Sequence, residues 1–286
     1  MWHKEFFMKF SERILSMPAS PIRRLMPYAD SAKERGIEVY HANIGQPDIK
    51  APDCLATAMQ QCATDYVPYG PSAGLMSYRK ALVKYYQSAT GAELKPENIL
   101  VTTAGSEALL FSFMALCNPG DEIIVPEPFY ANVAGFACET GVKLVALPTK
   151  FEEGFALPDP SVFASVISDR TRAVYICNPG NPTGIVYTRE SLLALAELAK
   201  QHDFFLIGDE VYREFVYPGT TWCSLLSLPG VEDRVIVVDS VSKRYSLCGA
   251  RIGCLVSRNT ELLALILKLG QARLCPPTNE QHMLTY

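Results

Sequence analysis

Lys243 is placed for covalent chemistry on a carbonyl compound. It follows a continuous apolar run, residues 235–238, which is typical of a strand buried on both faces of a sheet. Burial at the end of such a strand disfavours the charged ammonium form of a lysine. The neutral amine that remains is a nucleophile and can form a Schiff base with an aldehyde or a ketone.

Candidate phosphate ligands accompany this lysine in the sequence. Ser240 and Ser242 precede Lys243, and Arg251 follows it by eight residues. Hydroxyl groups and a guanidinium are suited to hold a phosphate group. An amine for an aldehyde, beside ligands for a phosphate, indicates pyridoxal phosphate (PLP) as the cofactor. Taken alone, the same residues also fit a strand followed by a solvated lysine and arginine.

The whole segment resembles the Schiff-base segment of class I aminotransferases, Ser-x-Ser-Lys-x-Tyr/Phe-x-x-x-Gly-x-Arg-x-Gly. Every fixed position of that pattern is filled here, by Ser240, Ser242, Lys243, Tyr245, Gly249, Arg251 and Gly253. The chain is therefore similar to the aspartate-aminotransferase-like PLP enzymes of fold type I. The resemblance implies that Lys243 carries PLP as a Schiff base, and that Ser240, Ser242 and Arg251 bind its phosphate.

Gly105 and Ser106 lie where an apolar strand passes into a helix, in the segment Thr-Thr-Ala-Gly-Ser-Glu-Ala at residues 102–108. Small residues at such a turn let a phosphate approach the free N–H groups of the first helical turn. The plain alternative is a tight turn with Ser106 as the N-cap. The resemblance implies the first interpretation, because this turn cradles the PLP phosphate in the family.

A second signature of the family, Asn-Pro-x-Asn-Pro-Thr-Gly, occupies residues 178–184. Two Asn-Pro steps after a strand hold the backbone extended, which by itself also fits an ordinary turn. In the family the second asparagine, here Asn181, bonds to the phenolate oxygen of PLP and helps to hold the substrate carboxylate. Gly45 belongs to a Gly-x-Pro-Asp element that borders the substrate in the family.

An acidic residue, Asp209, follows the apolar strand predicted at residues 204–207. Such a strand also resembles the Walker B strand of an ATPase, but the phosphate-binding motif G-x-x-x-x-G-K-[ST] is absent from the sequence, which excludes that function. In the aminotransferase family, Asp209 keeps the pyridine nitrogen protonated. A protonated ring accepts electrons more readily. Tyr212 donates to the phenolate oxygen in the same family.

Two further tyrosines complete the predicted site. Tyr130 follows the strand at residues 122–125, and alignment with the family makes it the aromatic residue that stacks on the PLP ring, with Phe129 adjacent. Tyr69 lies five residues before Gly74, as in the Tyr-x-x-x-x-Gly loop of the family, where it reaches the phosphate in the neighbouring subunit. That role requires a homodimer. The alternatives are an ordinary half-buried tyrosine and an ordinary surface tyrosine.

The predicted activity is that of a transaminase. The amino group of an L-amino acid, aspartate-like or other, passes to a 2-oxo acid, with Lys243, Asp209 and Tyr212 as catalytic residues. Two alternatives stay open. A PLP-dependent carbon–sulfur lyase uses the same fold. A PLP-binding regulator is disfavoured, because fewer than 50 residues precede the predicted large domain and none of them form a basic DNA-binding motif.

Strands and helices alternate along most of the chain. The predicted strands are 99–103, 122–125, 142–147, 172–177, 204–207, 235–238 and 252–256, and the predicted helices are 21–35, 51–64, 75–89, 106–117, 131–139, 189–202 and 261–269. This pattern predicts an α/β fold with a mainly parallel sheet, which binds ligands at the carboxyl ends of its strands. The resemblance implies the PLP-dependent transferase fold of type I, with a seven-stranded-type sheet flanked by helices.

Two domains are expected from the resemblance. Residues 1–48 are predicted to form an N-terminal arm and the first part of a small domain, and residues 49–286 the PLP-binding large domain. In the family the chain continues, with the rest of the small domain and an arginine for the substrate α-carboxylate. We therefore expect a C-terminally truncated fragment that is poorly soluble or binds PLP with little activity. No family motif assigns a role to Arg273.

Composition excludes several other classes of protein. The 286 residues carry a net charge of −4, which provides no basic surface for nucleic acid. Nine cysteines without a Cys-x-x-Cys pair, and four isolated histidines, argue against a metal site and favour the reducing cytoplasm. No apolar run approaches about 18 residues, and the charged N-terminal segment lacks the apolar core of a signal peptide. No membrane partner is expected.

Overall fold

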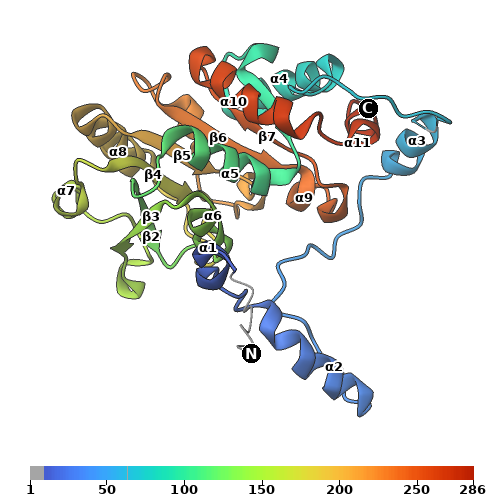
Figure 1. Cartoon of the computed structure of the whole chain (residues 1–286), viewed down its shortest axis with the longest axis horizontal. Helices are drawn as coiled ribbons and strands as arrows, with labels where there is room; N and C mark the ends of the chain where they lie inside the picture. The colour runs from blue at the N-terminus through green and yellow to red at the C-terminus, as the bar shows by residue number, and fades with distance from the viewer. Residues whose placement is uncertain (1–9, 63) are drawn as a thin grey trace, which may run out of the picture.

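A sheet of seven strands organises residues 10–62 and 64–286, the part of the chain that the computed structural model describes (Figure 1). Its order is β1 (Ile99–Thr102), β7 (Gly253–Val256), β6 (Val235–Ser240), β5 (Phe205–Asp209), β4 (Thr171–Cys177), β2 (Glu122–Glu127) and β3 (Lys143–Pro148). Within this described sheet, β7 alone runs antiparallel to its neighbours, β1 and β6, while the other neighbouring pairs are parallel. The predicted mainly parallel α/β sheet is confirmed.

The strands separate two hydrophobic cores, because successive side chains of a strand point to opposite faces. In β6, Val235 and Val237 belong to one core, and Ile236 and Val238 to the other. The first core is covered by α4 (Met76–Thr90), α7 (Pro160–Val166) and α8 (Arg189–His202), and the second by α5 (Ala104–Leu116), α6 (Asn132–Thr140) and α10 (Thr260–Arg273). Burial on both faces explains why these strands are continuous apolar runs.

The carboxyl ends of the parallel strands lie together at one end of the sheet, which we call the carboxyl end. Because β7 is antiparallel, it starts at this end, where Gly253 pairs with Ser240 of β6 and with Thr102 of β1. The one-turn helix α9 (Val241–Arg244) follows β6 directly. The described residues also contain short 3-10 helices, which are η1 (Arg23–Leu25), η2 (Pro96–Asn98), η3 (Phe151–Glu153), η4 (Arg213–Phe215), η5 (Leu225–Ser227) and η6 (Cys248–Ala250).

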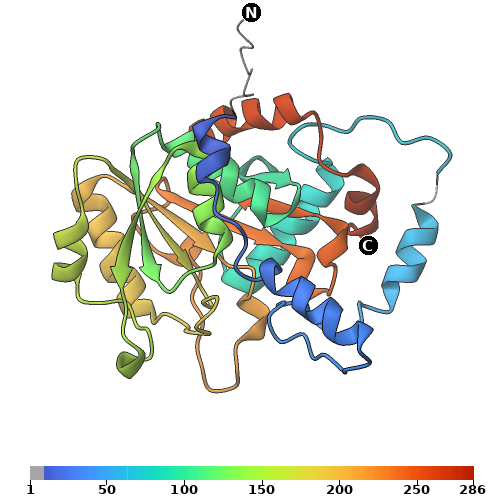
Figure 2. The same cartoon turned by 60° about the horizontal axis from the view of Figure 1, so that its bottom comes forward.

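The N-terminal segment lies outside the two cores. The short helix α1 (Glu12–Ser16) lies against α6, where Ser16 Oγ is 3.5 Å from Cys138 Sγ (Figure 2). The next helix, α2 (Met26–Glu34), projects from the rest of the molecule (Figure 1). As expected for the start of this helical segment, Ser20 Oγ accepts from Arg23 N at 3.3 Å. None of residues 10–57 is fully buried.

The last helix of the chain closes over the loop that carries Tyr69. This helix, α11 (Thr278–Met283), contacts α3 (Cys54–Gln61) and α4. Gln281 of α11 is fully buried, and its Oε1 accepts from Leu75 N at 2.7 Å. The C-terminal residues therefore fix the backbone just after the predicted Tyr-x-x-x-x-Gly loop.

Some elements differ from the predictions. The helices α1, α7, α9 and α11 were not predicted, because helices of 5, 7, 4 and 6 residues are too short to show an apolar period. The first residue of α5 is Ala104, so Ser106 is not its N-cap. Thr103 takes that place, and its N–H donates to Glu107 Oε2 at 2.8 Å.

Parts of two predictions lie outside the described residues: residues 1–9 of the predicted arm, and residue 63 in the predicted helix 51–64. None of the helices within the described residues combines the length and the apolar character that a membrane span requires.

Candidate active site

Most of the predicted site residues follow the carboxyl ends of neighbouring strands. Parallel strands bring these chain segments to the same end of the sheet. They are Gly105 and Ser106 after β1, Tyr130 after β2, Asn181 after β4, Asp209 and Tyr212 at and after β5, and Ser240, Ser242 and Lys243 at and after β6. Arg251 joins them from the other direction, because it precedes the antiparallel strand β7.

Lys243 points its amine at the backbone of residue 45. Lys243 Nζ donates to Gly45 O at 2.5 Å and lies 6.0 Å from the centre of the Tyr212 ring. The side chain is half-buried, whereas the sequence suggested a lysine desolvated by the strand end. The helix α9 explains the difference, because it carries Lys243 beyond the buried end of β6. Two predicted site residues from distant parts of the sequence, Gly45 and Tyr212, thus lie near the amine of Lys243.

The base of α9 is held by a buried aspartate that the sequence did not single out. Asp239, the residue before Ser240, accepts from Tyr86 Oη and Arg213 Nη2, each at 2.8 Å, and also from Arg244 Nη2. Burial alone raises the pKa of a carboxyl group, but Arg213 and Arg244 outweigh it and hold the pKa of Asp239 below its ordinary value. The turn between Ser240 and Lys243 therefore follows a buried, charged carboxylate that is held by three side-chain donors.

Asp209 is buried at the end of β5 with weak hydrogen-bond partners. Its carboxylate accepts from Val211 N and Tyr175 Oη, both at 3.3 Å. Among the described residues, no lysine or arginine forms an ion pair with it. Burial raises the pKa of Asp209 to about 6. A buried carboxylate of this kind is stabilised by any cation brought beside it, which suits the protonated nitrogen of a pyridine ring.

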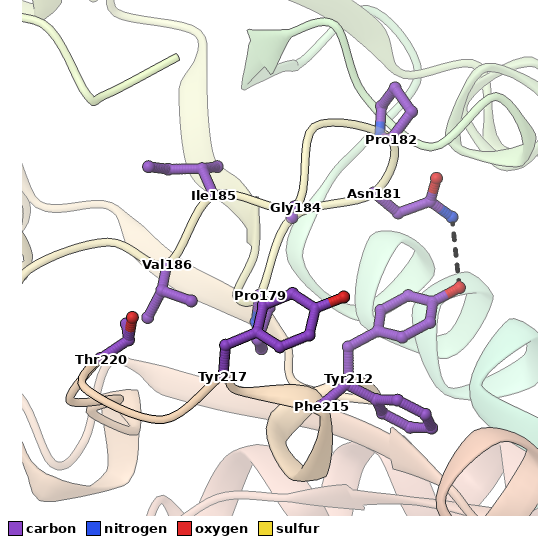
Figure 3. A pocket seen from close by; sticks show the side chains of 11 residues that line it. Pro179, Asn181, Pro182, Gly184, Ile185, Val186, Tyr212, Phe215, Tyr217 and Thr220 are labelled. Atoms are coloured by element: carbon purple, nitrogen blue, oxygen red, sulfur yellow. Dashed lines mark hydrogen bonds between the residues drawn. The ribbon is translucent and has the colours of Figure 1, made fainter. Parts of the chain in front are cut away.

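Asn181 and Tyr212 face each other across the space beside Asp209. Asn181 Nδ2 donates to Tyr212 Oη at 3.5 Å, and both side chains are half-buried (Figure 3). Burial raises the pKa of Tyr212, so its phenol keeps the proton at neutral pH. A cavity of about 570 Å³ adjoins the pair and is lined by Pro179, Ile185, Phe215 and Tyr217 among others. One amide and one phenol can therefore both donate to an oxygen placed between them.

The first turn of α5 packs closely against β7 and presents free N–H groups. A Cβ atom on Gly253 would lie 2.4 Å from the carbonyl carbon of Ala104 and 2.6 Å from Gly105 N, so only glycine lets β7 approach this turn. On Gly105 a Cβ atom would meet a Val238 methyl at 3.4 Å. The N–H groups of Ala104, Gly105 and Ser106 belong to the first helical turn and have no intrahelical acceptor. Such groups are suited to bind a phosphate.

The remaining predicted phosphate ligands surround this turn with different exposure. Ser240 and Ser242 are buried, and Ser240 Oγ accepts from Ser242 N at 3.3 Å. Arg251 is exposed and its Nη1 donates to Cys248 O at 2.9 Å, so the structure does not join its guanidinium to either serine.

The two predicted tyrosines have different surroundings. Tyr130 is half-buried, and its Oη accepts from Asn132 Nδ2 at 2.8 Å. Burial raises the pKa of its phenol, and the charge of Asp209 raises it further. Tyr69 is 81% exposed and is not part of the group around Lys243 within this chain. A role for Tyr69 in a neighbouring subunit stays a prediction.

The residues present fit PLP. The amine of Lys243, the buried carboxylate of Asp209 and the free N–H groups of α5 match the aldehyde, the ring nitrogen and the phosphate of the cofactor. A metal site finds no such support, because the described residues contain no cluster of three histidine, cysteine or acidic side chains. Analysis of the sequence did not identify Asp239, Arg213 or Tyr86 as supporting residues. The one available signal was Asp239 itself, an acidic residue directly before the predicted phosphate ligand Ser240.

Comparison with known proteins gives the family. Residues 39–285 match the family model described as aminotransferase class I and II. The probable aspartate/prephenate aminotransferase of Thermus aquaticus is 33% identical over 272 residues, which are 95% of this chain and 70% of that protein. The aspartate aminotransferase of Pinus pinaster is also 33% identical, over 248 residues that make up 86% of this chain and 50% of that protein.

Solved structures agree with this assignment. The aspartate aminotransferase from Thermus thermophilus with maleate has a TM-score of 0.90 at 30% sequence identity, and the match covers 98% of this chain and 72% of that one. The alanine aminotransferase from Pyrococcus furiosus has a TM-score of 0.89 at 32% identity, over 97% of this chain and 72% of that one.

These matches confirm the predicted fold type I, PLP as the cofactor and transamination as the activity, and they do not favour the carbon–sulfur lyase. The chain belongs to the class I and II aminotransferases, which are PLP-dependent transaminases.

Proposed function

We propose that this chain carries out its transamination at the carboxyl end of the sheet, on an acidic L-amino acid and a 2-oxo acid. The observation that carries the proposal is the meeting of Lys243, Asp209 and the Asn181–Tyr212 pair around one space. The ends of three strands, β4, β5 and β6, and the turn at Gly45 contribute to it. With PLP as the acceptor of electrons, an amine, a buried carboxylate and two hydrogen-bond donors supply the protein groups that proton transfer at an amino acid requires.

Lys243 is the proposed covalent attachment point and the proton carrier. PLP, when bound, supplies an aldehyde carbon for an amine and a ring that accepts the electron pair released at the substrate Cα. The Lys243 amine has one backbone acceptor, Gly45 O, at 2.5 Å. This contact holds Nζ at the entrance to the site. Once a substrate amine had displaced it, the free Nζ would be placed to take the proton from the substrate Cα and to deliver it to the carbon of the cofactor that carried the aldehyde.

Asp209, Tyr212 and Asn181 are proposed to tune the cofactor ring. Asp209 has a pKa raised to about 6 by burial, and a protonated ring nitrogen beside it lowers that pKa again and keeps the pair charged. Tyr212 keeps its proton because burial raises its pKa, so it donates to a phenolate oxygen. Asn181 lies 3.5 Å from Tyr212 Oη, where its amide donates to the same oxygen and to a substrate carboxylate.

The phosphate end of the site is proposed to be held by both subunits of a homodimer. Within one chain the ligands are the first turn of α5 with Gly105 and Ser106, the serines Ser240 and Ser242, and Arg251. Tyr69 of the second copy completes the set. Its 81% exposure in the single chain supports this arrangement. Tyr130 is proposed to stack on the ring from its half-buried position.

The substrate class follows from the relatives named above. Two of them are named for aspartate or for aspartate and prephenate, and one structure is described with maleate, a dicarboxylate. We therefore propose an acidic amino donor, with Gly45 and Asn181 bordering it. The proposed division into residues 1–48 and 49–286 is supported by the lack of fully buried residues from 10 to 57. The proposed location is the cytoplasm.

Borohydride reduction tests the central assignment. With PLP present, reduction should fix the cofactor covalently on Lys243, and peptide mass spectrometry should find the label there. The variant Lys243→Ala should take up no label, while Lys268→Ala, which removes an exposed lysine of α10, should label normally. A label on another lysine in the wild-type protein would show that the site is elsewhere.

A further inference from the structure

Arg273 ends α10 and directs its guanidinium into the protein. Its side chain is 16% exposed. Nη1 donates to Glu107 Oε2 at 2.8 Å, Nη2 donates to Ser72 O at 3.1 Å, and Nε lies 3.5 Å from Gly270 O. A guanidinium presents its donors in one rigid plane, so this single side chain connects α10, α5 and the loop before α4. A lysine carries its three donors on one nitrogen, so it cannot span these separated acceptors in the same way.

The first arm of this fork reaches the first turn of α5. Glu107 Oε2 also accepts from Thr103 N at 2.8 Å, so the carboxylate closes the N-terminal end of the helix. The free N–H groups of Ala104, Gly105 and Ser106 lie in the same turn. An uncompensated negative charge here would repel a phosphate bound to those groups. Arg273 neutralises that charge while leaving the carboxylate in place as a cap.

The second arm reaches the loop that carries Tyr69. Ser72 lies three residues after this tyrosine, and its carbonyl accepts from Arg273 Nη2. The neighbouring backbone is also fixed, because Val101 N of β1 donates to Ala73 O at 3.0 Å. A Cβ atom on Gly74 would lie 2.3 Å from a Val101 methyl, so the loop packs directly on β1. Tyr69 therefore projects from a loop whose base cannot shift freely.

We propose that Arg273 is a positioning residue for the phosphate end of the active site, which it couples to the Tyr69 loop. The inference rests on the proposed function, because it concerns the phosphate of PLP. Arg273 acts in two ways: it cancels the charge of Glu107 beside the bound phosphate, and it fixes the loop that offers Tyr69 to the neighbouring subunit. Its guanidinium is committed to protein acceptors, so it is not offered to the substrate carboxylate.

The test compares binding of PLP with binding of pyridoxal, which has the same aldehyde and ring but no phosphate. Affinities are measured by absorbance titration of the cofactor-free protein, and stability by thermal unfolding of the same samples. The variants are Arg273→Met, Arg273→Lys and the double variant Arg273→Met with Glu107→Gln. The matched control is Arg172→Met. Arg172 Nε lies 3.3 Å from Asp121 Oδ2, and Asp121 caps Asn118 N just beyond the other end of α5.

Arg273→Met should weaken PLP binding about tenfold while pyridoxal binding stays within about twofold of the wild type. Arg273→Lys should lose less, because it retains the charge beside Glu107. The double variant should bind PLP more tightly than Arg273→Met, because the substituted glutamine side chain keeps a capping oxygen without the charge. Arg172→Met should alter stability alone.

Two results overturn the proposal. One is an equal loss of PLP and pyridoxal affinity in Arg273→Met, which indicates a general packing role. The other is a double variant that binds PLP more weakly than Arg273→Met, which contradicts the charge argument. If Arg273→Met does not fold, the ratio of PLP to pyridoxal affinity in Arg273→Lys decides, and an unchanged ratio overturns the proposal. A wild-type protein that binds neither compound would instead contradict the proposed function itself.

Discussion

Two buried aspartates at the ends of adjacent strands have opposite surroundings. Asp209 ends β5 and Asp239 is the fifth residue of β6, which pairs with β5 in parallel. Asp239 has two arginines and a tyrosine as partners, and its pKa lies below the ordinary value. Within the part of the chain that the structure describes, Asp209 forms no ion pair, and burial raises its pKa to about 6. Residue type and burial are the same, so the partners alone separate a structural carboxylate from one that is ready for a ligand.

The largest expected effect is a loss of stability when Asp239, the structural aspartate of the two, is substituted. Asp239→Asn leaves Arg213 and Arg244 buried without a counter-charge, and each already has one buried nitrogen without a hydrogen-bond partner. We expect a loss of about 3–5 kcal/mol in the free energy of unfolding, measured by urea unfolding of the cofactor-free protein. Asp203→Asn, which breaks the more exposed pair with Arg234, should cost at most about 1 kcal/mol. Equal losses in both variants would remove Asp239 from its structural role.

The next effect concerns turnover and the other member of the pair. Asp209→Asn removes the charge that faces the cofactor nitrogen but keeps the shape of the side chain. We expect turnover with an acidic amino donor and 2-oxoglutarate to fall by about 10²–10³, roughly 3–4 kcal/mol of activation free energy. PLP should stay bound, because its phosphate ligands are untouched. Near-normal turnover in this variant would break the contrast between the two aspartates.

A smaller effect is the pH dependence of stability without the cofactor. The pKa of Asp209 in the folded protein, about 6, is above its ordinary value of 3.8, so the folded protein holds the proton more strongly. Its contribution therefore destabilises the fold as pH rises from about 4 through 6, by at most roughly 3 kcal/mol. Asp209→Asn has no such titration and should gain stability relative to the wild type over this range.

The difference in unfolding free energy between the wild type and Asp209→Asn isolates the titration of Asp209, because Glu210 is present in both proteins. Burial raises the pKa of Glu210 to about 7, so its own titration cancels when the wild type and Asp209→Asn are compared at each pH. Urea unfolding at pH 4, 5, 6 and 7 provides the curve. Parallel stability curves for the two proteins would mean that Asp209 has an ordinary pKa.

Much of the fold could be predicted from the sequence because the buried strands are apolar runs. The run at residues 235–238 marks β6, and the polar residues after it mark the carboxyl end of the sheet. The helix α9 could not be predicted, since four residues carry no period. The carbonyl of Gly45 as the partner of Lys243 Nζ was also beyond the sequence, since 198 positions separate these residues.

The candidate site divides in the same way. Asp209, Asn181 and Lys243 belong to short motifs, and their spacing is visible in the sequence. The partners that hold such residues in place are contributed by distant segments: Tyr86 and Asp239 are 153 positions apart, and Glu107 and Arg273 are 166 apart. Pairings over such distances depend on the folded backbone and leave no local pattern.

The reversed direction of β7 makes the lysine segment a closed loop with a narrow neck. Ser240 and Gly253 are paired in the ladder between β6 and β7, so the chain leaves and re-enters the sheet at adjacent points. The neck is closely packed, since a Cβ atom on Gly253 would have no room against α5. Insertions between Arg244 and Cys248 therefore lengthen a loop whose ends stay fixed, which costs little closure entropy, whereas exchanges of Tyr245 or Leu247 also disturb the core against which these side chains pack. This stretch is therefore where the loop after the Schiff-base lysine can be lengthened without changing the register of the sheet.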